Sequence, residues 1–242
     1  MCWSQQISWG FALVEAISLM CLWRLSNGFT RHARHLQPLL ISIWTIELFE
    51  ACIWPTVDLG GSTHGNCNTT NRFLTWMIFV NLSLQPLLVN IAALHIQPYR
   101  EVFKVTSFMA AIATLCYLIS LMLGEVGEVD LMSFAATRYL GMHGTETCSF
   151  LGSYNHLHWV FKISANFMLP NGYTYIFMML PPLISKPWHL LAAPLGAYLL
   201  LFAALFYSMG YSFEAGSVWC WSAIGLHLYA YILCFSLAEK NA

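Results

Sequence analysis

Charged residues are scarce in this sequence, and their scarcity excludes most soluble folds. Only 9% of the 242 residues are Asp, Glu, Lys or Arg, while 58% are hydrophobic. An average soluble domain contains about 25% charged and roughly 45–50% apolar residues. The formal net charge is −1, so the chain has neither a basic surface for nucleic acid nor an acidic tail. We therefore expect an integral membrane protein whose main partner is the lipid bilayer, with no nucleic acid partner.

Flexible linkers and a basic leader are also missing. No segment is low in complexity or rich in Gly and Ser, which predicts a single transmembrane domain over residues 1–242. No Lys or Arg precedes the first apolar run, whereas a cleavable signal has a basic start. We expect that run to be retained as a span.

Apolar runs long enough to cross a bilayer are abundant. A transmembrane helix needs roughly 20 mostly apolar residues, because its backbone polar groups find no water in the bilayer. Seven runs qualify, which predicts an all-α polytopic membrane protein, a bundle of about seven transmembrane helices. The expected spans cover residues 8–26, 37–56, 73–95, 105–124, 155–184, 189–209 and 218–237. The fifth is overlong and contains Pro170-Asn171-Gly172, so we expect it to be kinked, broken or preceded by a short interfacial helix.

Basic residues gather on one side of this predicted topology. Lys and Arg near span ends mark the cytoplasmic side. One side has Arg24, Arg31, Arg34, Arg100, Lys104, Lys186 and Lys240, and the other has Arg72 and Arg138, with Lys162 near it. We therefore predict an N-terminus outside and a C-terminus in the cytoplasm. The expected location is the plasma membrane or another membrane of the secretory route.

Half of the cysteines fall on the predicted outer face. These disulfide candidates are Cys2, Cys67, Cys148 and Cys220. Four cysteines allow three pairings, and the sequence does not choose among them. The alternative is that they are small buried thiols. Asn68-Thr69-Thr70 lies on the same side, which makes Asn68 a glycosylation candidate in a eukaryotic host.

Polar residues inside the predicted spans form the candidate site. An ionisable side chain at bilayer depth costs at least about 2–3 kcal/mol, so such residues usually face the bundle interior and mark a pathway. We expect a shared polar cavity that opens toward the outside. Its candidate residues are Glu15, Glu47, Glu50, Asn81, Gln85, Asn90, His158, Lys162, Asn166 and His227. Within this set, His158, Lys162 and Asn166 recur every fourth residue, which predicts a polar stripe along the fifth span.

The balance of intramembrane charge sharpens this expectation. Three acids share the predicted cavity with the cationic candidates Lys162 and His227. We therefore expect at least one carboxyl group to share a proton with a neighbour or to bind a cation. The alternative is that these polar residues only join helices, by hydrogen bonds worth about 0.6–2 kcal/mol each.

Several known classes of membrane protein have sequence motifs that this chain lacks. The last span has no Lys that could carry retinal. The acidic-Arg-Tyr triplet and the Asn-Pro pair of G-protein-coupled receptors are also absent from the third and seventh spans. His156 and His158 are two residues apart and do not share a helical face, as a zinc pair would require. A seven-span hydrolase of the ceramidase kind would place a second His at position 231, where this chain has Tyr231. We assign no metal site, the cofactor remains unknown, and enzyme activity remains an open question.

A set of short motifs carries a family resemblance. They are Met1-Cys2-Trp3-Ser4, Glu47-Leu48, Leu84-Gln85-Pro86 with Asn90, and Cys148 ahead of His158-Trp159. With these motifs the chain resembles uncharacterised small multipass membrane proteins, bacterial and viral, that begin Met-Cys-Trp-Ser. The resemblance implies a seven-helix membrane fold and no known activity. The Lys162 stripe and the long acidic outer loop depart from the pattern.

Three functions remain open at this point. The first is transport or sensing of protons, a cation or a small polar solute through the cavity. The second is an intramembrane enzyme that depends on a metal or cofactor. The third is a structural or partner-binding membrane protein with no catalytic site.

Overall fold

Long helices dominate the computed structural model. It describes residues 4–26, 31–57, 67–96, 99–126, 146–152, 154–163, 172–186, 191–209, 214–220 and 222–239. The longest helices are α1 (Gln5–Ser26), α2 (Arg31–Ile53), α3 (Thr69–Ile96) and α4 (Arg100–Val126). By length and composition, each of these four is apolar enough to cross a membrane.

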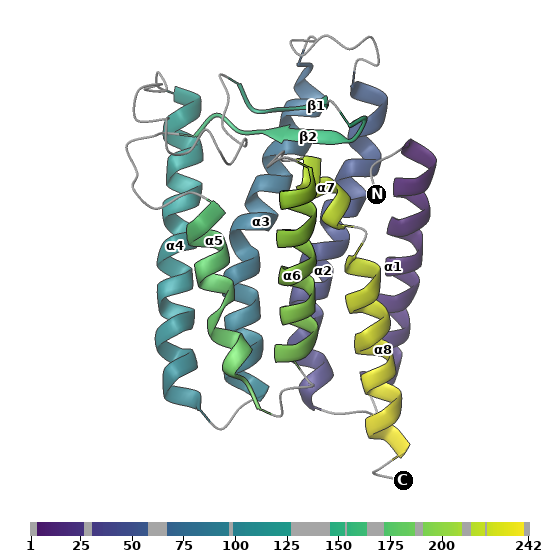
Figure 1. The fold of residues 1–242 in the computed structure, drawn as a ribbon, viewed down its shortest axis with the longest axis vertical. Coiled ribbons are helices and arrows are strands. Elements are labelled where there is room, and N and C mark those ends of the chain that lie inside the picture. Colours follow the sequence, from purple (N-terminus) through teal and green to yellow (C-terminus); the bar gives the residue numbers. More distant parts are fainter. Residues whose placement is uncertain are drawn as a thin grey trace.

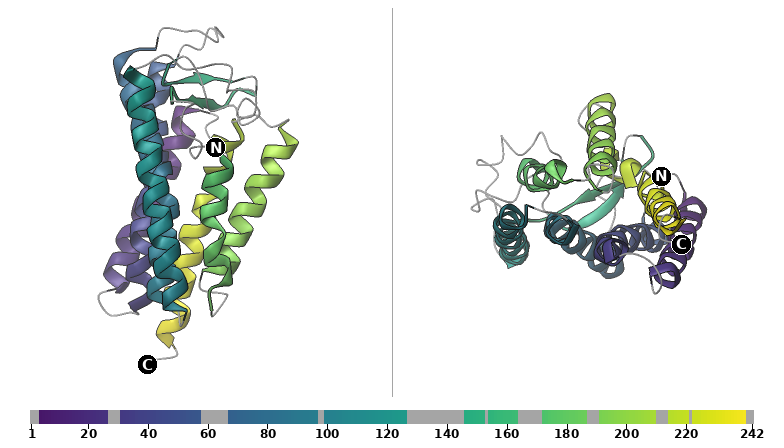
Figure 2. Two further views of the ribbon diagram at one scale, coloured as in Figure 1. Left: turned by 90° about the vertical axis from the view of Figure 1, so that its left-hand side faces the viewer. Right: turned by 90° about the horizontal axis from the view of Figure 1, so that it is seen from below.

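Shorter helices make up the second half of the chain. They are α5 (Gly172–Met179), α6 (Ala192–Ser208), α7 (Glu214–Cys220) and α8 (Ala223–Glu239), with short 3-10 turns η1 (Trp54–Thr56) after α2 and η3 (Pro181–Ile184) after α5. Figure 2 shows α1 to α4 as one layer of the bundle and α5, α6 and α8 as a second layer. α1 begins at the same end of the bundle as α7, and α8 ends at the opposite end (Figure 1).

A β-hairpin lies across one end of the bundle (Figure 1). Strand β1 (Cys148–Leu151) pairs antiparallel with β2 (Leu157–Val160), with Ser149 opposite Trp159. In β2, Leu157 and Trp159 are buried while the alternate residues His158 and Val160 are only partly buried. A strand repeats every two residues, so this alternation turns one face of the hairpin toward the helices. We call this end of the molecule the hairpin end.

The hairpin corrects the predicted fifth span. The prediction of a helix that begins at residue 155 was wrong, because residues 157–160 form β2 and helix α5 begins only at Gly172. Buried and partly buried residues alternate along this strand, as they do not along a helix. His158 and Lys162 therefore do not share a helix face. Asn166 lies outside the described residues.

Three helices meet around a small apolar cluster away from the hairpin. Leu22 of α1, Leu40 of α2 and Ala230 of α8 are buried against one another. We call these three residues the lower apolar cluster. Higher along the same helices, the Trp44 indole Nε1 donates a hydrogen bond to the Ala12 carbonyl, at 2.8 Å, and joins α2 to α1.

Candidate functional site

Two acids and a histidine come together where α1, α2 and α8 pack. Glu15, Glu47 and His227 have exposed fractions of 0%, 0% and 1%. The imidazole Nε2 of His227 lies 3.8 Å from Oε2 of Glu15, and the carboxyl groups of Glu15 and Glu47 lie within electrostatic range of each other. We call these three residues the acidic cluster.

Helix periodicity explains why these acids are inside. On α1, Ser8, Ala12, Glu15 and Leu22 are buried, and their spacings of three, four and seven residues place them on one face. Glu15 therefore occupies a core position. On α2, Glu47 and Glu50 are three residues apart and both are fully buried, with Glu50 one turn nearer the hairpin end.

The acidic cluster has almost no polar contacts. Both carboxylate oxygens of Glu15 and of Glu47, and both ring nitrogens of His227, lack a hydrogen-bond partner among the described residues. The backbone carbonyl of Leu40 faces the His227 ring, outside good hydrogen-bond geometry. Buried polar groups in proteins are nearly always hydrogen-bonded, so a cluster of this kind requires an explanation.

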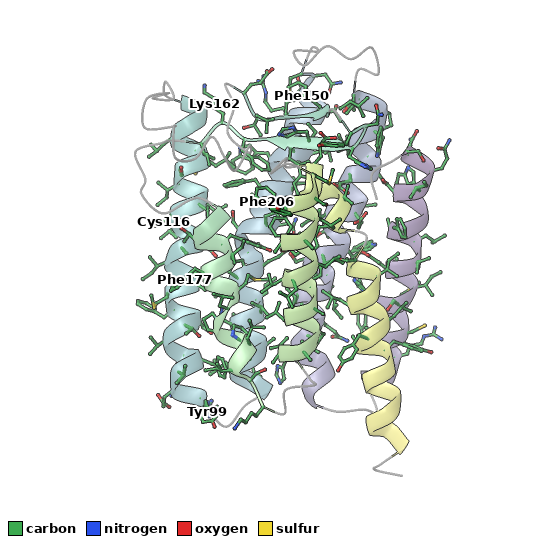
Figure 3. The ribbon with its side chains drawn as sticks, viewed as in Figure 1. Tyr99, Cys116, Phe150, Lys162, Phe177 and Phe206 are labelled. Atoms are coloured by element: carbon green, nitrogen blue, oxygen red, sulfur yellow. A yellow bond between two sulfur atoms is a disulfide. The ribbon has the colours of Figure 1, made fainter. Side chains whose placement is uncertain are left out.

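The described lysines and arginines do not neutralise the cluster. Arg72 pairs with Glu146 at 3.6 Å, and Lys104 pairs with Glu101 at 2.7 Å. The expected counter-ion Lys162 follows β2, and its backbone N–H donates to Thr147 Oγ1 at 3.0 Å. Figure 3 shows it beside the upper end of α4, away from α1 and α8. The structure therefore does not bring Lys162 to the acidic cluster, because the residues that follow β2 pack against α4.

Gly124 explains how closely that segment approaches α4. A Cβ atom at Gly124 would lie 2.4 Å from the Lys162 carbonyl oxygen and 2.7 Å from Cα of Ile163. Only glycine leaves room for the backbone here. This contact holds Lys162 and Ile163 against α4.

Asn81 and Gln85 of α3, unlike the acids of the acidic cluster, have side-chain hydrogen bonds to neighbouring helices. The Thr45 hydroxyl of α2 donates to Asn81 Oδ1 at 2.9 Å, and the Tyr175 hydroxyl of α5 donates to Gln85 Oε1. Both side chains thus join α3 to a neighbouring helix. The structure does not bring them to the acidic cluster.

Asn90, one turn beyond Pro86 of α3, also joins helices. Its Nδ2 donates to the Met178 carbonyl of α5 at 2.8 Å and to the Pro86 carbonyl at 2.7 Å. Proline lacks the N–H that a helix uses, so polar side chains around such a site restore contacts to the backbone. We call the contacts of Asn81, Gln85 and Asn90 the α3 interface.

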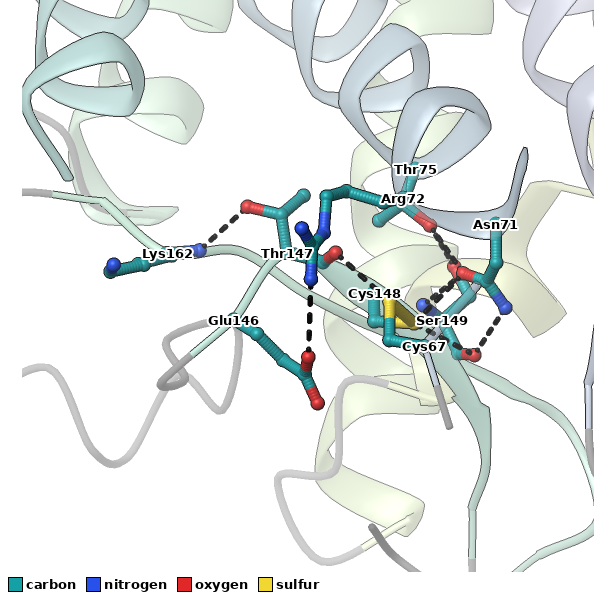
Figure 4. Close-up of polar contacts among 9 residues, drawn as sticks. All are labelled: Cys67, Asn71, Arg72, Thr75, Glu146, Thr147, Cys148, Ser149 and Lys162. Carbon is teal, nitrogen blue, oxygen red and sulfur yellow. Dashed lines mark hydrogen bonds and ion pairs between the residues drawn. A yellow bond between two sulfur atoms is a disulfide. The ribbon is translucent and has the colours of Figure 1, made fainter. Parts of the chain in front are cut away.

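The hairpin is fixed to α3 by a disulfide and an amide side chain. Cys67 and Cys148 are disulfide-bonded, one of the pairs that the outer cysteines allow. Asn71 Nδ2 donates to the Ser149 carbonyl at 2.9 Å, and the Ser149 N–H donates to Asn71 Oδ1 at 2.8 Å (Figure 4). The Thr75 and Ser149 hydroxyls are 2.7 Å apart. Asn71 thus acts on β1 as a neighbouring strand would.

The other outer candidates have separate outcomes. Cys2 and the side chain of Cys220 lie outside the described residues. Asn68 precedes α3, and its Oδ1 accepts a hydrogen bond from the Asn71 N–H at 2.8 Å, which is the geometry of a helix N-cap. Glycosylation at Asn68 stays a prediction.

Glu214 is a structural residue that sequence reasoning missed. Its Oε2 accepts hydrogen bonds from the N–H groups of Tyr154, at 2.9 Å, and His156, at 3.2 Å. A Cβ at Gly152 would lie 2.0 Å from Cδ of Glu214, so the turn closes directly on this carboxylate. No spacing in the sequence marks an acid that binds the backbone of a distant turn. This contact joins the hairpin to α7, which leads into α8.

A second missed feature is a stacked pair of histidines. The rings of His35 in α2 and His95 in α3 are 4.1 Å apart and 6° from parallel. Across the described ranges of the chain, no group of three or more His, Cys, Asp or Glu side chains is arranged to bind a metal ion. The His35 and His95 rings pack face to face and join the ends of two helices.

The fold and site define a helical bundle with four membrane-length helices, a disulfide-linked hairpin at one end and buried acids inside. Residues 60–237 match a family of unknown function (DUF5765), and the chain belongs to that family. It is also 25% identical over 186 residues to an uncharacterised protein of Acanthamoeba polyphaga mimivirus, covering 74% of this chain and 72% of the viral protein. No solved structure matches the chain.

The matched range covers only part of the site. It includes the Cys67–Cys148 disulfide and His227, and it begins after α2, so Glu15 and Glu47 lie outside it. The expected membership of an uncharacterised family with a viral relative is confirmed. The opening Met-Cys-Trp-Ser motif lies outside the matched range and stays a prediction.

Proposed function

We propose that this protein is a seven-span membrane protein that moves or senses protons through its acidic cluster. The seven spans would be α1, α2, α3, α4, α5 with η3, α6 and α8. Successive helices alternate in direction, and α1 begins at the end opposite to the one where α8 ends (Figure 1). An odd number of crossings would give this arrangement of the two ends.

The hairpin end would face the outside. Disulfides persist in oxidising compartments, and the Cys67–Cys148 bond lies at that end. Arg24 lies in the last turn of α1 and Arg100 begins α4, both at the opposite end, as the positive-inside rule requires of the cytoplasmic side. This orientation favours the plasma membrane or another membrane of the secretory route.

The observation that carries the proposal is the unpaired burial of Glu15 and Glu47 beside His227. Each buried, uncompensated ion costs several kcal/mol, so the cluster is least costly when its total charge is zero. Two protonated carboxyl groups with a neutral imidazole satisfy this condition, and so does one carboxylate with an imidazolium. The two arrangements differ only in the position of one proton. Its transfer across the 3.8 Å between Glu15 and His227 would need one bridging water or a small movement of the side chains.

Proton flux into proteoliposomes tests the proposal. Vesicles holding a pH-sensitive dye would receive an acid pulse from outside, with a potassium gradient and valinomycin to set the membrane potential. Native protein should acidify the vesicles, and Glu47→Gln should remove most of the flux because an amide cannot release a proton. Glu101→Gln is the matched control, since the Glu101 side chain is 83% exposed and pairs only with the exposed Lys104.

Four outcomes separate the alternatives. Flux no greater than in empty vesicles, or unchanged by Glu47→Gln, would overturn the proposal. Flux that requires sodium or potassium would make a cation the transported species. Bound metal or visible absorbance in the purified protein would favour an intramembrane enzyme, and loss of stability without any flux would favour a structural role.

A further inference from the structure

We infer that water reaches the acidic cluster from the hairpin end only, along a row of buried polar atoms, while the lower apolar cluster closes the other end. This inference rests on the proposed function for its purpose, although its tests do not depend on flux. It is carried by the positions of unpaired polar atoms on three separate elements.

The first two positions lie on antiparallel helices. Ser8 precedes Glu15 by seven residues on α1, and Trp54 follows Glu47 by seven residues and begins η1, directly after α2. Seven residues return to the same helical face about 10 Å along the axis. Because α1 and α2 run in opposite directions, both displacements point toward the hairpin end (Figure 1).

Both positions have buried polar atoms that lack a partner. Ser8 is fully buried and Trp54 is 8% exposed. The Ser8 hydroxyl and the Trp54 indole Nε1 have no hydrogen-bond partner within the part of the chain that the structure describes. Glu50, also fully buried, lies between Glu47 and Trp54 on the same face of α2.

The third position is on the inner face of the hairpin. Trp159 is 2% exposed and packs in one apolar cluster with Trp54. Its six-membered ring faces Gly216 of α7, where a Cβ would lie 3.2 Å from Cζ3, so its Nε1 edge points away from α7. That Nε1 also has no hydrogen-bond partner from any described residue. The row therefore runs from Glu47 to the hairpin.

An unpaired buried N–H is costly, and ordered water is the usual partner of such a group. Each atom of the row offers a donor or acceptor to water, whereas the apolar side chains between them offer none. Water molecules linked in this way would connect the acidic cluster to the hairpin end. A proton moving along them would need no large motion of the helices.

In the opposite direction the Ser18 hydroxyl, one turn past Glu15 on α1, is also buried without a hydrogen-bond partner among the described residues, and beyond it the same faces become apolar. Leu22 follows Glu15 by seven residues, and Leu40 precedes Glu47 by seven, so both lie on the same faces but away from the hairpin. They are 2% and 4% exposed and pack against Ala230, which lies three residues beyond His227 on α8. A dry apolar contact offers water no partners, so the cluster is accessible from one side.

Thiol labelling tests this access directly. Glu47→Cys would be made in a chain that keeps only Cys67 and Cys148, and a membrane-impermeant methanethiosulfonate would be applied to each face of oriented vesicles. The control is Ile46→Cys, one residue earlier on α2 and equally buried at 2% exposed. Labelling a dry buried thiol requires local opening, so we expect Ile46→Cys to react at least about tenfold more slowly.

The labelling has clear outcomes. Reaction of Glu47→Cys from the hairpin face, and much more slowly from the other face, supports the inference. Equal rates from both faces, or a rate no faster than that of Ile46→Cys, would overturn it. A chain that transports protons yet fails this test would keep the proposed function and lose the one-sided path.

Indole hydrogen exchange gives a second, independent test. The N–H groups of Trp54 and Trp159 should exchange rapidly with deuterated water in nanodiscs, as followed by 15N spectra with assignments from Trp→Phe variants. Trp44 and Trp219 are the matched controls, because their Nε1 atoms donate to the carbonyls of Ala12 and Tyr198, both at 2.8 Å. Exchange of Trp54 and Trp159 as slow as that of the controls would show dry indoles and contradict the path.

Discussion

The α3 interface and the acidic cluster both bury polar side chains between apolar helices, but they differ in whether those side chains have hydrogen-bond partners. Asn81, Gln85 and Asn90 each form at least one hydrogen bond to a neighbouring helix. Glu15 and Glu47 form none with any residue in the described ranges. The contrast teaches that burial alone does not identify a functional polar residue, whereas burial without a partner points to one.

The two regions should respond to mutation with opposite signs. Removing a satisfied polar group leaves its former partner unpaired and destabilises the fold. Removing an unsatisfied one relieves a desolvation cost and stabilises the fold, while function is lost.

The largest effect is expected at the disulfide that secures the hairpin to α3. Replacing Cys67 and Cys148 by Ser removes a cross-link between residues 81 positions apart. The loop-closure entropy returned to the unfolded chain costs about 4–5 kcal/mol of stability. The measurement is the thermal unfolding midpoint without reductant. Cys116→Ser, at a free thiol, should leave the midpoint unchanged, and an unchanged midpoint in the double variant would contradict the account.

The next effect is expected at Asn71. Asn71→Leu keeps the size of the side chain but leaves the N–H and carbonyl of Ser149 unpaired at a buried position. We expect a loss of about 2–4 kcal/mol in the free energy of unfolding. Thr70→Ala, at the exposed residue before it, serves as the control. Equal unfolding midpoints for the two variants would show that this amide does not support the hairpin.

A change of opposite sign is expected in the acidic cluster. Glu47→Met replaces an unpaired buried carboxyl group by an apolar side chain of similar size, so stability should rise by about 1–3 kcal/mol. Thermal unfolding in detergent measures the change. Ile43→Met, one turn away on α2, controls for repacking and should cost stability. Destabilisation by Glu47→Met as large as that by Asn71→Leu would mean that Glu47 is bonded like the residues of the α3 interface.

The smallest effect is expected for a single hydrogen bond of the α3 interface. A double-mutant cycle with Gln85→Met and Tyr175→Phe should give a coupling energy of about 0.6–1.7 kcal/mol, the range measured between membrane helices. The same cycle between Gln85 and Thr114, whose hydroxyl bonds to Ser83 instead, should give no coupling. A coupling energy of zero between Gln85 and Tyr175 would show that this hydrogen bond does not stabilise the α3 interface.

Much of the helical fold could be predicted from hydropathy alone. The expected spans at residues 8–26, 73–95 and 105–124 fall within α1, α3 and α4. The reason is that a membrane-length apolar run has few alternatives to a helix. The start of α5 at Gly172, directly after Pro170-Asn171 in the sequence, also follows from local sequence.

The hairpin could have been recognised from hydropathy, because four of the nine residues 155–163 are polar and this stretch is far less apolar than the membrane-length helices. A second signal was the placement of Leu157, Trp159 and Phe161 at alternate positions, with His158 and Lys162 among their neighbours, which is typical of a strand with one buried face. His158 and Lys162 were misplaced because four-residue spacing means a shared face only on a helix.

The candidate site was partly predictable. Burial of Glu15, Glu47 and Glu50 follows from their positions among apolar residues of a helix face. Which polar residues find partners does not, because that depends on how α3, α5 and α8 pack. The contacts of Glu214 with the hairpin turn join residues about 60 positions apart and left no pattern in the sequence.

Infrared difference spectroscopy across a pH step tests the central claim most directly. Protonated carboxyl groups absorb at a carbonyl stretching frequency that carboxylates lack, so proton exchange at a buried acid appears as a difference band. The account predicts such a band in the native protein in membranes, reduced by Glu15→Gln and by Glu47→Gln and unaffected by Glu101→Gln. A band that persists unchanged in both variants would contradict proton exchange at the acidic cluster.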